Sequence, residues 1–145
     1  MEIPLTGKII FYAVISAMGI ICMFLWYWQW NVLRGKAMPN PDGTFDDWHD
    51  QKLYYGFAVA DIFIAIPFTL AGIILIFAGI KAGYNMTAMS SFWFLWINSV
   101  TTITSLRFAK PKITLEWFVV FPLGAVLGLI YLVWTCIYLR SVWWS

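Results

Sequence analysis

Asp61 is the side chain in this sequence that is best placed to do chemistry. It interrupts an apolar run from Leu53 to Ile80 and lies eight residues into that run, which is about 12 Å along a helix at about 1.5 Å per residue. A carboxyl group at that depth in a bilayer is costly and rare, so it indicates a functional site. Asp61 is therefore our first candidate for binding a proton, a cation or a polar ligand.

Asn98 and a row of hydroxyl groups form the second candidate feature. Asn98 lies in the apolar run 86–106, at the depth expected for Asp61 if the two helices are antiparallel. Thr102 and Ser105 follow it at helical spacing, so the three side chains share one face. A carboxyl facing an amide and hydroxyls could bind a proton, a cation or a polar ligand group. We favour the alternative, in which Asp61 and Asn98 bond each other and join two helices.

Trp93 and Trp96 lie near the middle of the same run. At that depth an indole N–H needs a hydrogen-bond partner or a ligand, so both rings join the candidate binding residues. Eleven other Trp and Tyr residues lie near the ends of the apolar runs, which is typical of an interfacial belt. They are Trp26, Trp28, Trp30, Trp48, Tyr54, Tyr55, Tyr84, Trp117, Tyr138, Trp143 and Trp144.

The acidic segment before the second apolar run could suit a divalent metal. Asp46, His49 and Asp50 would share one helical face. However, Thr44 followed three residues later by Asp47 fits a capping box, and acids at a helix start complement its dipole. A single histidine without nearby cysteine is a poor ligand set and excludes bis-histidine haem. We therefore expect no metal site and no cofactor.

The two cysteines are not expected to form a redox centre. Cys22 and Cys136 do not form a C-x-x-C motif, and their helical positions place them about 20 Å and about 5 Å from the terminal side. That separation is far outside disulfide range, so both are expected to be packed thiols. The sequence also lacks a Ser–His or Cys–His pair at matching depth. Glu116 is the only obvious second acid for an enzyme built on Asp61.

One further group of residues could contact lipids. Arg107, Lys110 and Lys112 form a basic cluster at the expected membrane surface, where they could hold an anionic lipid headgroup. We favour a simpler interpretation, in which these cations only set the orientation of the chain.

Small residues predict where helices approach closely. Gly124 and Gly128 form a G-x-x-x-G motif, and Gly56 with Ala60 forms a small-x-x-x-small motif. Such notches let helix backbones pack closely, either within the chain or between subunits.

Two prolines interrupt the apolar runs. Pro67 and Pro122 each remove a backbone donor, so each is expected to kink its helix. Pro67 follows Asp61 by six residues, so a kink there would lie close to the first candidate site.

The composition defines the elements that must position these residues. The chain has 145 residues, of which 62% are hydrophobic and 11% charged. A soluble domain of this size could not bury so much apolar surface. A net charge of +2 with scattered basic residues excludes a nucleic-acid binder. About 90 apolar residues, at about 20 per crossing, predict four crossings.

The predicted fold class is all-α, an integral membrane four-helix bundle. The helices are expected at about 9–30, 45–80, 86–106 and 114–140, with one long loop at 31–44, in a single domain. Short links favour antiparallel neighbours and hence an up-down-up-down topology.

An even number of crossings places both termini on one side of the membrane. Three basic residues fall on that side and six on the other. The positive-inside rule therefore favours termini on the non-cytoplasmic side. The two sets are Lys8, Lys81 and Arg140, and Arg34, Lys36, Lys52, Arg107, Lys110 and Lys112.

Three classes of function remain open. The favoured class is a non-catalytic accessory subunit that packs in a larger membrane complex. The alternative is a small ligand- or ion-binding protein or transporter that uses Asp61. The weakest is an enzyme acting on a lipid-like substrate with Glu116 as the second acid. The expected partners are membrane lipids and either other membrane subunits or further copies of the chain, with no nucleic acid.

Overall fold

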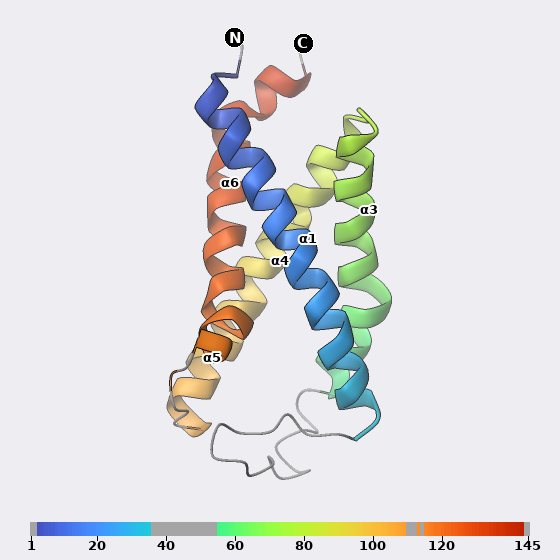
Figure 1. Ribbon diagram of the computed structural model, residues 1–145, viewed down its shortest axis with the longest axis vertical. Coiled ribbons are helices and arrows are strands. Elements are labelled where there is room, and N and C mark those ends of the chain that lie inside the picture. The colour runs from blue at the N-terminus through green and yellow to red at the C-terminus, as the bar shows by residue number, and fades with distance from the viewer. Residues whose placement is uncertain (1–2, 36–54, 110–112, 114, 144–145) are drawn as a thin grey trace.

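The computed structural model describes residues 3–35, 55–109, 113 and 115–143 (Figure 1). Within these residues all regular secondary structure is helical, which confirms the all-helical prediction for this part of the chain. The first described helix is α1 (Leu5–Leu33). The second runs from residues 55–60 through the π-helical turn η1 (Asp61–Ala65) into α3 (Ile66–Phe77). They are followed by α4 (Ala82–Thr104), the π-helical turn η2 (Ser105–Ala109), α5 (Leu115–Val120) and α6 (Pro122–Trp143).

Three of these helices are long and apolar enough to cross a membrane. They are Leu5–Leu33, Tyr55–Phe77 and Trp117–Tyr138. Helices satisfy their own backbone hydrogen bonds, so they are the state expected of such apolar runs in lipid. α4 has 23 residues, but both of its halves carry hydroxyl and amide side chains, so it is less apolar than these three helices.

The helices end where the local sequence stops them. Gly35 and Gly79 follow α1 and α3 with positive φ angles of 70° and 75°, a conformation that glycine adopts at little cost after a helix. Pro122 has no N–H, and the predicted run 114–140 is divided at Phe121 into α5 and α6. α1 extends the predicted run at both ends, and the predicted helical residues 45–54 lie outside the described residues.

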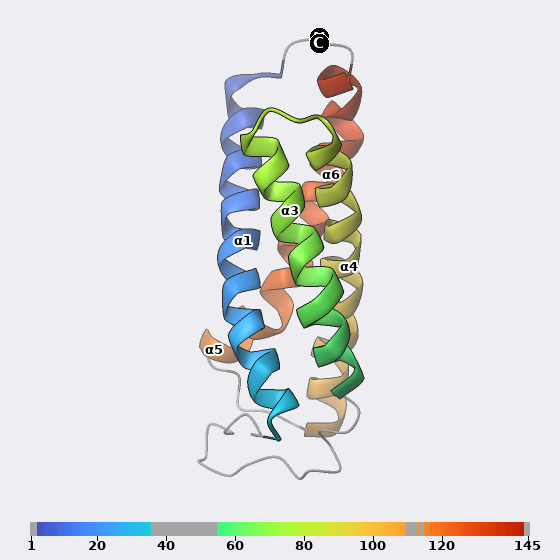
Figure 2. The ribbon, with the colours of Figure 1, turned by 90° about the vertical axis from the view of Figure 1, so that its right-hand side faces the viewer.

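The long helices lie side by side along the long axis of the molecule (Figures 1 and 2). α1 packs against α6 and α3, and α4 packs against the same two helices. In Figure 1, α1 crosses in front of α4, passing from the α6 side at one end to the α3 side at the other. The first turns of α1 and the last turns of α6 therefore lie at the same end, called the terminal end below.

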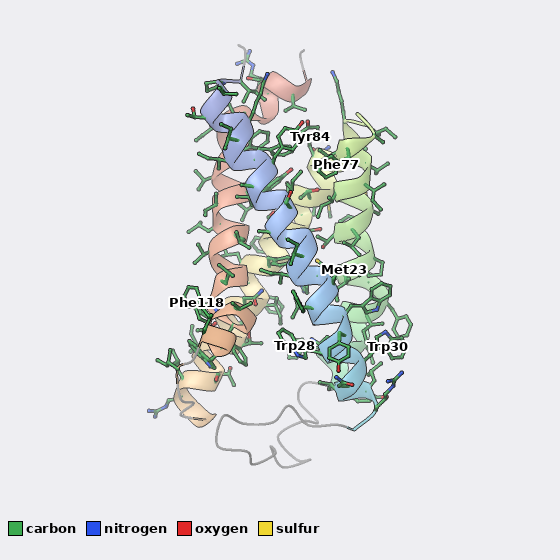
Figure 3. The ribbon with its side chains drawn as sticks, in the orientation of Figure 1. Met23, Trp28, Trp30, Phe77, Tyr84 and Phe118 are labelled. Carbon is green, nitrogen blue, oxygen red and sulfur yellow. The ribbon has the colours of Figure 1, made fainter. Side chains whose placement is uncertain are left out.

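Aromatic rings fill the core toward the terminal end. Phe11 of α1 has its ring centroid 4.4 Å from that of Trp134 and 5.3 Å from that of Tyr84. Tyr131 of α6 packs against both Phe11 and Trp134. Figure 3 shows Tyr84 in this part of the molecule, whereas Trp28 and Trp30 lie toward the opposite end. Trp134 also donates from Nε1 to the carbonyl oxygen of Gly7 at 2.9 Å, which joins α6 to the start of α1.

Replacing Trp134 with phenylalanine is expected to lower the free energy of unfolding by about 1.5 kcal/mol, because the variant loses the buried hydrogen bond to Gly7. The matched control is Trp96→Phe, since the Trp96 ring is 52% exposed and its loss should change stability by less than about 0.5 kcal/mol. Unfolding in mixed micelles, followed by circular dichroism, measures both values. Equal losses in the two variants would contradict the assigned role of the Trp134 bond.

Two glycines let α3 and α4 approach at backbone distance. A Cβ atom built on Gly83 would lie 2.6 Å from the carbonyl oxygen of Gly72 and 2.7 Å from the nitrogen of Ile76. One built on Gly72 would lie 2.9 Å from the hydroxyl oxygen of Thr87. The sequence motifs did not identify this contact, because the two glycines lie on different helices.

Candidate functional site

Asp61 lies on the inner side of the helix Tyr55–Phe77, at the start of the turn η1. Its side chain is only 4% exposed. Ala58, Ile62 and Ile66 are buried on the same helix, so Asp61 belongs to its packed face. The apolar neighbours turn this face inward, and the carboxyl is buried with them.

Gln29 of α1 is the partner of this carboxyl. Its Nε2 donates to Oδ2 of Asp61 at 2.6 Å, which joins two helices across 32 residues of sequence. Cys22, two turns earlier on α1, is buried near Asp61 and Thr69. The bond stabilises the buried Asp61 carboxyl, which would otherwise lack a hydrogen-bond donor, while Gln29 itself is half-buried.

The predicted pairing of Asp61 with Asn98 is wrong. Asn98 is buried, but its Nδ2 donates to the carbonyl oxygen of Phe94 in its own helix at 2.9 Å. Its side chain lies against Gly124, because a Cβ atom built on that glycine would meet the Asn98 amide at 2.5 Å. Asn98 therefore faces α6, whereas Asp61 faces α1.

The hydroxyl row that follows Asn98 also bonds within the chain. Thr102 donates to the carbonyl oxygen of Asn98 in the preceding turn. Ser105 is buried, and its Oγ accepts the indole N–H of Trp117 at 3.0 Å. This second bond joins the end of α4 to α5. The structure therefore does not bring this row together with Asp61.

The two tryptophans that the sequence singled out occupy different environments. Trp93 is half-buried and packs edge-on against Phe94, with ring centroids 4.9 Å apart. Trp96 lies on the outer surface, where its side chain is 52% exposed. Trp26 is the tryptophan whose indole nitrogen is buried without a hydrogen-bond partner among the described residues. It was missed because it was assigned to the interfacial belt.

The two small-residue motifs also differ. Gly128 faces α4 so closely that an added Cβ atom would lie 2.5 Å from the carbonyl oxygen of Ser91 and 2.7 Å from the nitrogen of Leu95. By contrast, Gly56 has nothing within 4 Å of the same built atom, and Ala60 is exposed. The first motif packs two helices of this chain, and the second packs none of the described residues.

The remaining candidates are placed as follows. Arg107 is exposed in η2, while Lys110, Lys112 and His49 lie outside the described residues. Glu116 belongs to α5, but its side chain is also outside the described part.

The prediction that both cysteines are packed thiols is wrong for Cys136. Cys22 is a buried thiol, but Cys136 is exposed on α6. Among the described residues, no three His, Cys, Asp or Glu side chains come together.

Gln29 could have been found from the sequence. It is the one amide side chain in the uncharged run 9–30, and antiparallel packing brings the end of that run next to the first part of the run that holds Asp61. Its position between Trp28 and Trp30 hid this signal, because the segment was interpreted as an interfacial belt.

Comparison of the chain with protein-family models, with curated proteins and with solved structures finds no match. The Gln29–Asp61 pair can join two helices by its hydrogen bond. It could also release the Asp61 carboxyl from Gln29, so that the carboxyl binds a proton or a cation instead.

Proposed function

We propose that this protein is an integral membrane four-helix bundle with up-down-up-down topology, and that it serves as a non-catalytic subunit packed against other membrane proteins. The observation that carries this proposal is the notch formed by Gly56 and Ala60, which we call the outer notch. It lies on the outer surface of an apolar helix of membrane-spanning length, and no described residue fills the space next to Gly56.

Other notches of the chain support this function. Gly128 lies against the α4 backbone, and Gly72 lies against Gly83. Close approach between small residues is a principal means of associating helices in lipid. Apolar side chains gain no hydrophobic free energy there when they move from lipid into a helix contact. The outer notch consists of small residues four positions apart, as in the pair Gly124 and Gly128. Its natural occupant is therefore a helix of another membrane protein.

The assignment of α4 as the fourth crossing has its own support. Its hydroxyl groups bond the carbonyl oxygens of the preceding turn, as in Thr87 to Gly83 at 2.8 Å and Ser91 to Thr87 at 2.7 Å. Such bonds hide polar groups within the helix and lower the cost of placing them in a bilayer. With four crossings, both termini lie on one side, and the distribution of Lys and Arg favours the non-cytoplasmic side.

The alternative function, ligand or ion binding at Asp61, has less support. The carboxyl already has an amide partner within hydrogen-bond distance. A ligand that takes the place of Gln29 would have to overcome the free energy of that bond.

The test fills the outer notch. In the variant Gly56→Leu with Ala60→Leu, the leucine side chains would occupy the space that a partner helix needs, so co-purification of the partner in a mild detergent should fall by at least about tenfold. The isolated chain should stay folded, since neither position packs against the described residues. Mass spectrometry of the purified assembly measures both the partner and its amount.

The matched control is Ala13→Leu, a small exposed position on α1 outside the notch. It should retain the partner. A monodisperse monomer from the native chain, or equal partner retention in the notch variant and the control, would contradict the proposed function.

A further inference from the structure

The helix Tyr55–Phe77 has a weak point just after Asp61. In η1 the N–H of Ile66 donates to the carbonyl oxygen of Asp61, five residues earlier instead of four. Pro67 follows at once and has no N–H to donate. Two consecutive departures from regular α-helical bonding therefore occur within seven residues, and such π-helical turns and prolines are the usual sites of helix bending.

The segment before this weak point is held from the side. Gln29 of α1 bonds Asp61 at the first residue of η1, and α1 packs against η1 as well as against α3. The Gln29–Asp61 bond joins side chains of the two helices at the turn itself, whereas Cys22 of α1 lies beside Thr69, beyond Pro67. The Gln29–Asp61 bond acts where the backbone of the helix is least constrained.

We infer that η1 and Pro67 form a hinge and that the Gln29–Asp61 bond holds it in one position. Residues 55–60 then have a fixed direction relative to α3 only while Asp61 stays bonded to α1. When the bond breaks, this segment pivots away from α1 while α3 keeps its place against α4. The Gln29–Asp61 bond therefore has a conformational role, because it sets the direction of residues 55–60 in addition to joining two helices.

The hinge has a consequence for the outer notch, because Gly56 and Ala60 both lie in the segment that pivots. Breaking the bond changes the direction in which the notch faces. This consequence depends on the proposed function, whereas the hinge itself does not, so the experiment below measures the hinge without any partner.

The test measures distances between spin labels on the purified chain. Labels are attached to cysteines placed at exposed positions in a Cys22→Ala, Cys136→Ser background: Val59 before the hinge and Val133 on α6 as the reference. A bend of about 20° acting over the roughly 10 Å from the hinge to Val59 should shift this distance by about 4 Å and broaden its distribution. A second reference, Ile20 on α1, detects motion in the perpendicular direction.

Two variants break the bond independently, Gln29→Leu and Asp61→Leu. Each should shift at least one of the Val59 distances. Asp61→Asn retains a carbonyl acceptor for Gln29 and should leave both distances unchanged. The control pair Ile74 and Val133 lies beyond the hinge and should keep its distance in all three variants.

Two results would overturn the inference. One is an unchanged pair of Val59 distances in either bond-breaking variant that folds. The other is a shift of the Ile74–Val133 distance, or loss of the fold, in both variants, because the bond would then support the whole chain and not a hinge. A failed partner test with a positive spin-label result would reject the proposed function alone.

Discussion

Substituting Gly128 with alanine is expected to lower the free energy of unfolding by about 3 kcal/mol, near the upper end of the cost of overpacking. The added Cβ would lie 2.5 Å from the carbonyl oxygen of Ser91 and 2.7 Å from the nitrogen of Leu95. Both are backbone atoms, so they cannot move aside as a flexible side chain would. Only a separation of α6 from α4 relieves the clash, and these two helices share the most extensive contact in the described chain.

The matched control is Gly56→Ala, which adds the same methyl group where nothing lies within 4 Å. Alanine is the better helix former, so this variant should gain up to about 1 kcal/mol. Unfolding by sodium dodecyl sulfate in mixed micelles, monitored by helical circular dichroism, compares the two variants under one condition. Equal effects at both positions would show that Gly128 does not face a packed backbone.

The second large effect is expected at Gln29. Its replacement with leucine leaves the Asp61 carboxyl buried without its amide donor, which should destabilise the chain by about 3 kcal/mol. Adding Asp61→Leu should restore most of this loss, because removing both partners of a buried polar pair costs far less than removing one. The same unfolding measurement on both single variants and the double variant gives the coupling between the two side chains.

Additive losses in this cycle would contradict a direct bond between Gln29 and Asp61. Asn98→Leu is a useful comparison, since the Asn98 amide bonds its own helix and lies against α6. Its loss should add to that of Gln29→Leu without coupling, because the two residues share no partner.

The positions of the helices were predictable because they depend on local chemistry. Apolar runs specify a membrane-length helix wherever the backbone must bond to itself. Gly79 and Pro122 mark a helix end and a helix break for equally local reasons, a positive φ angle and a missing N–H. Even the burial of Asp61 followed from its place within an apolar run.

The neighbours of each face were not predictable in the same way. Helical spacing predicted one face for Asn98, Thr102 and Ser105, but it could not say which helix that face would meet. The expected partner was Asp61, and the structure places α6 and α5 there instead. Likewise, equal spacing in two small-residue motifs did not distinguish the packed glycine Gly128 from the exposed glycine Gly56.

The sequence by itself therefore determined an all-helical chain with membrane-length apolar helices and one acid buried among them. Only the tertiary structure decided that Gln29 bonds Asp61, that α4 meets α6 at Gly124 and Gly128, and that the outer notch stays uncovered by the described residues. The physical reason is the range of the interactions. Hydrogen bonds along a helix act between residues three to five apart, whereas contacts between helices depend on how whole surfaces fit, which no local pattern encodes.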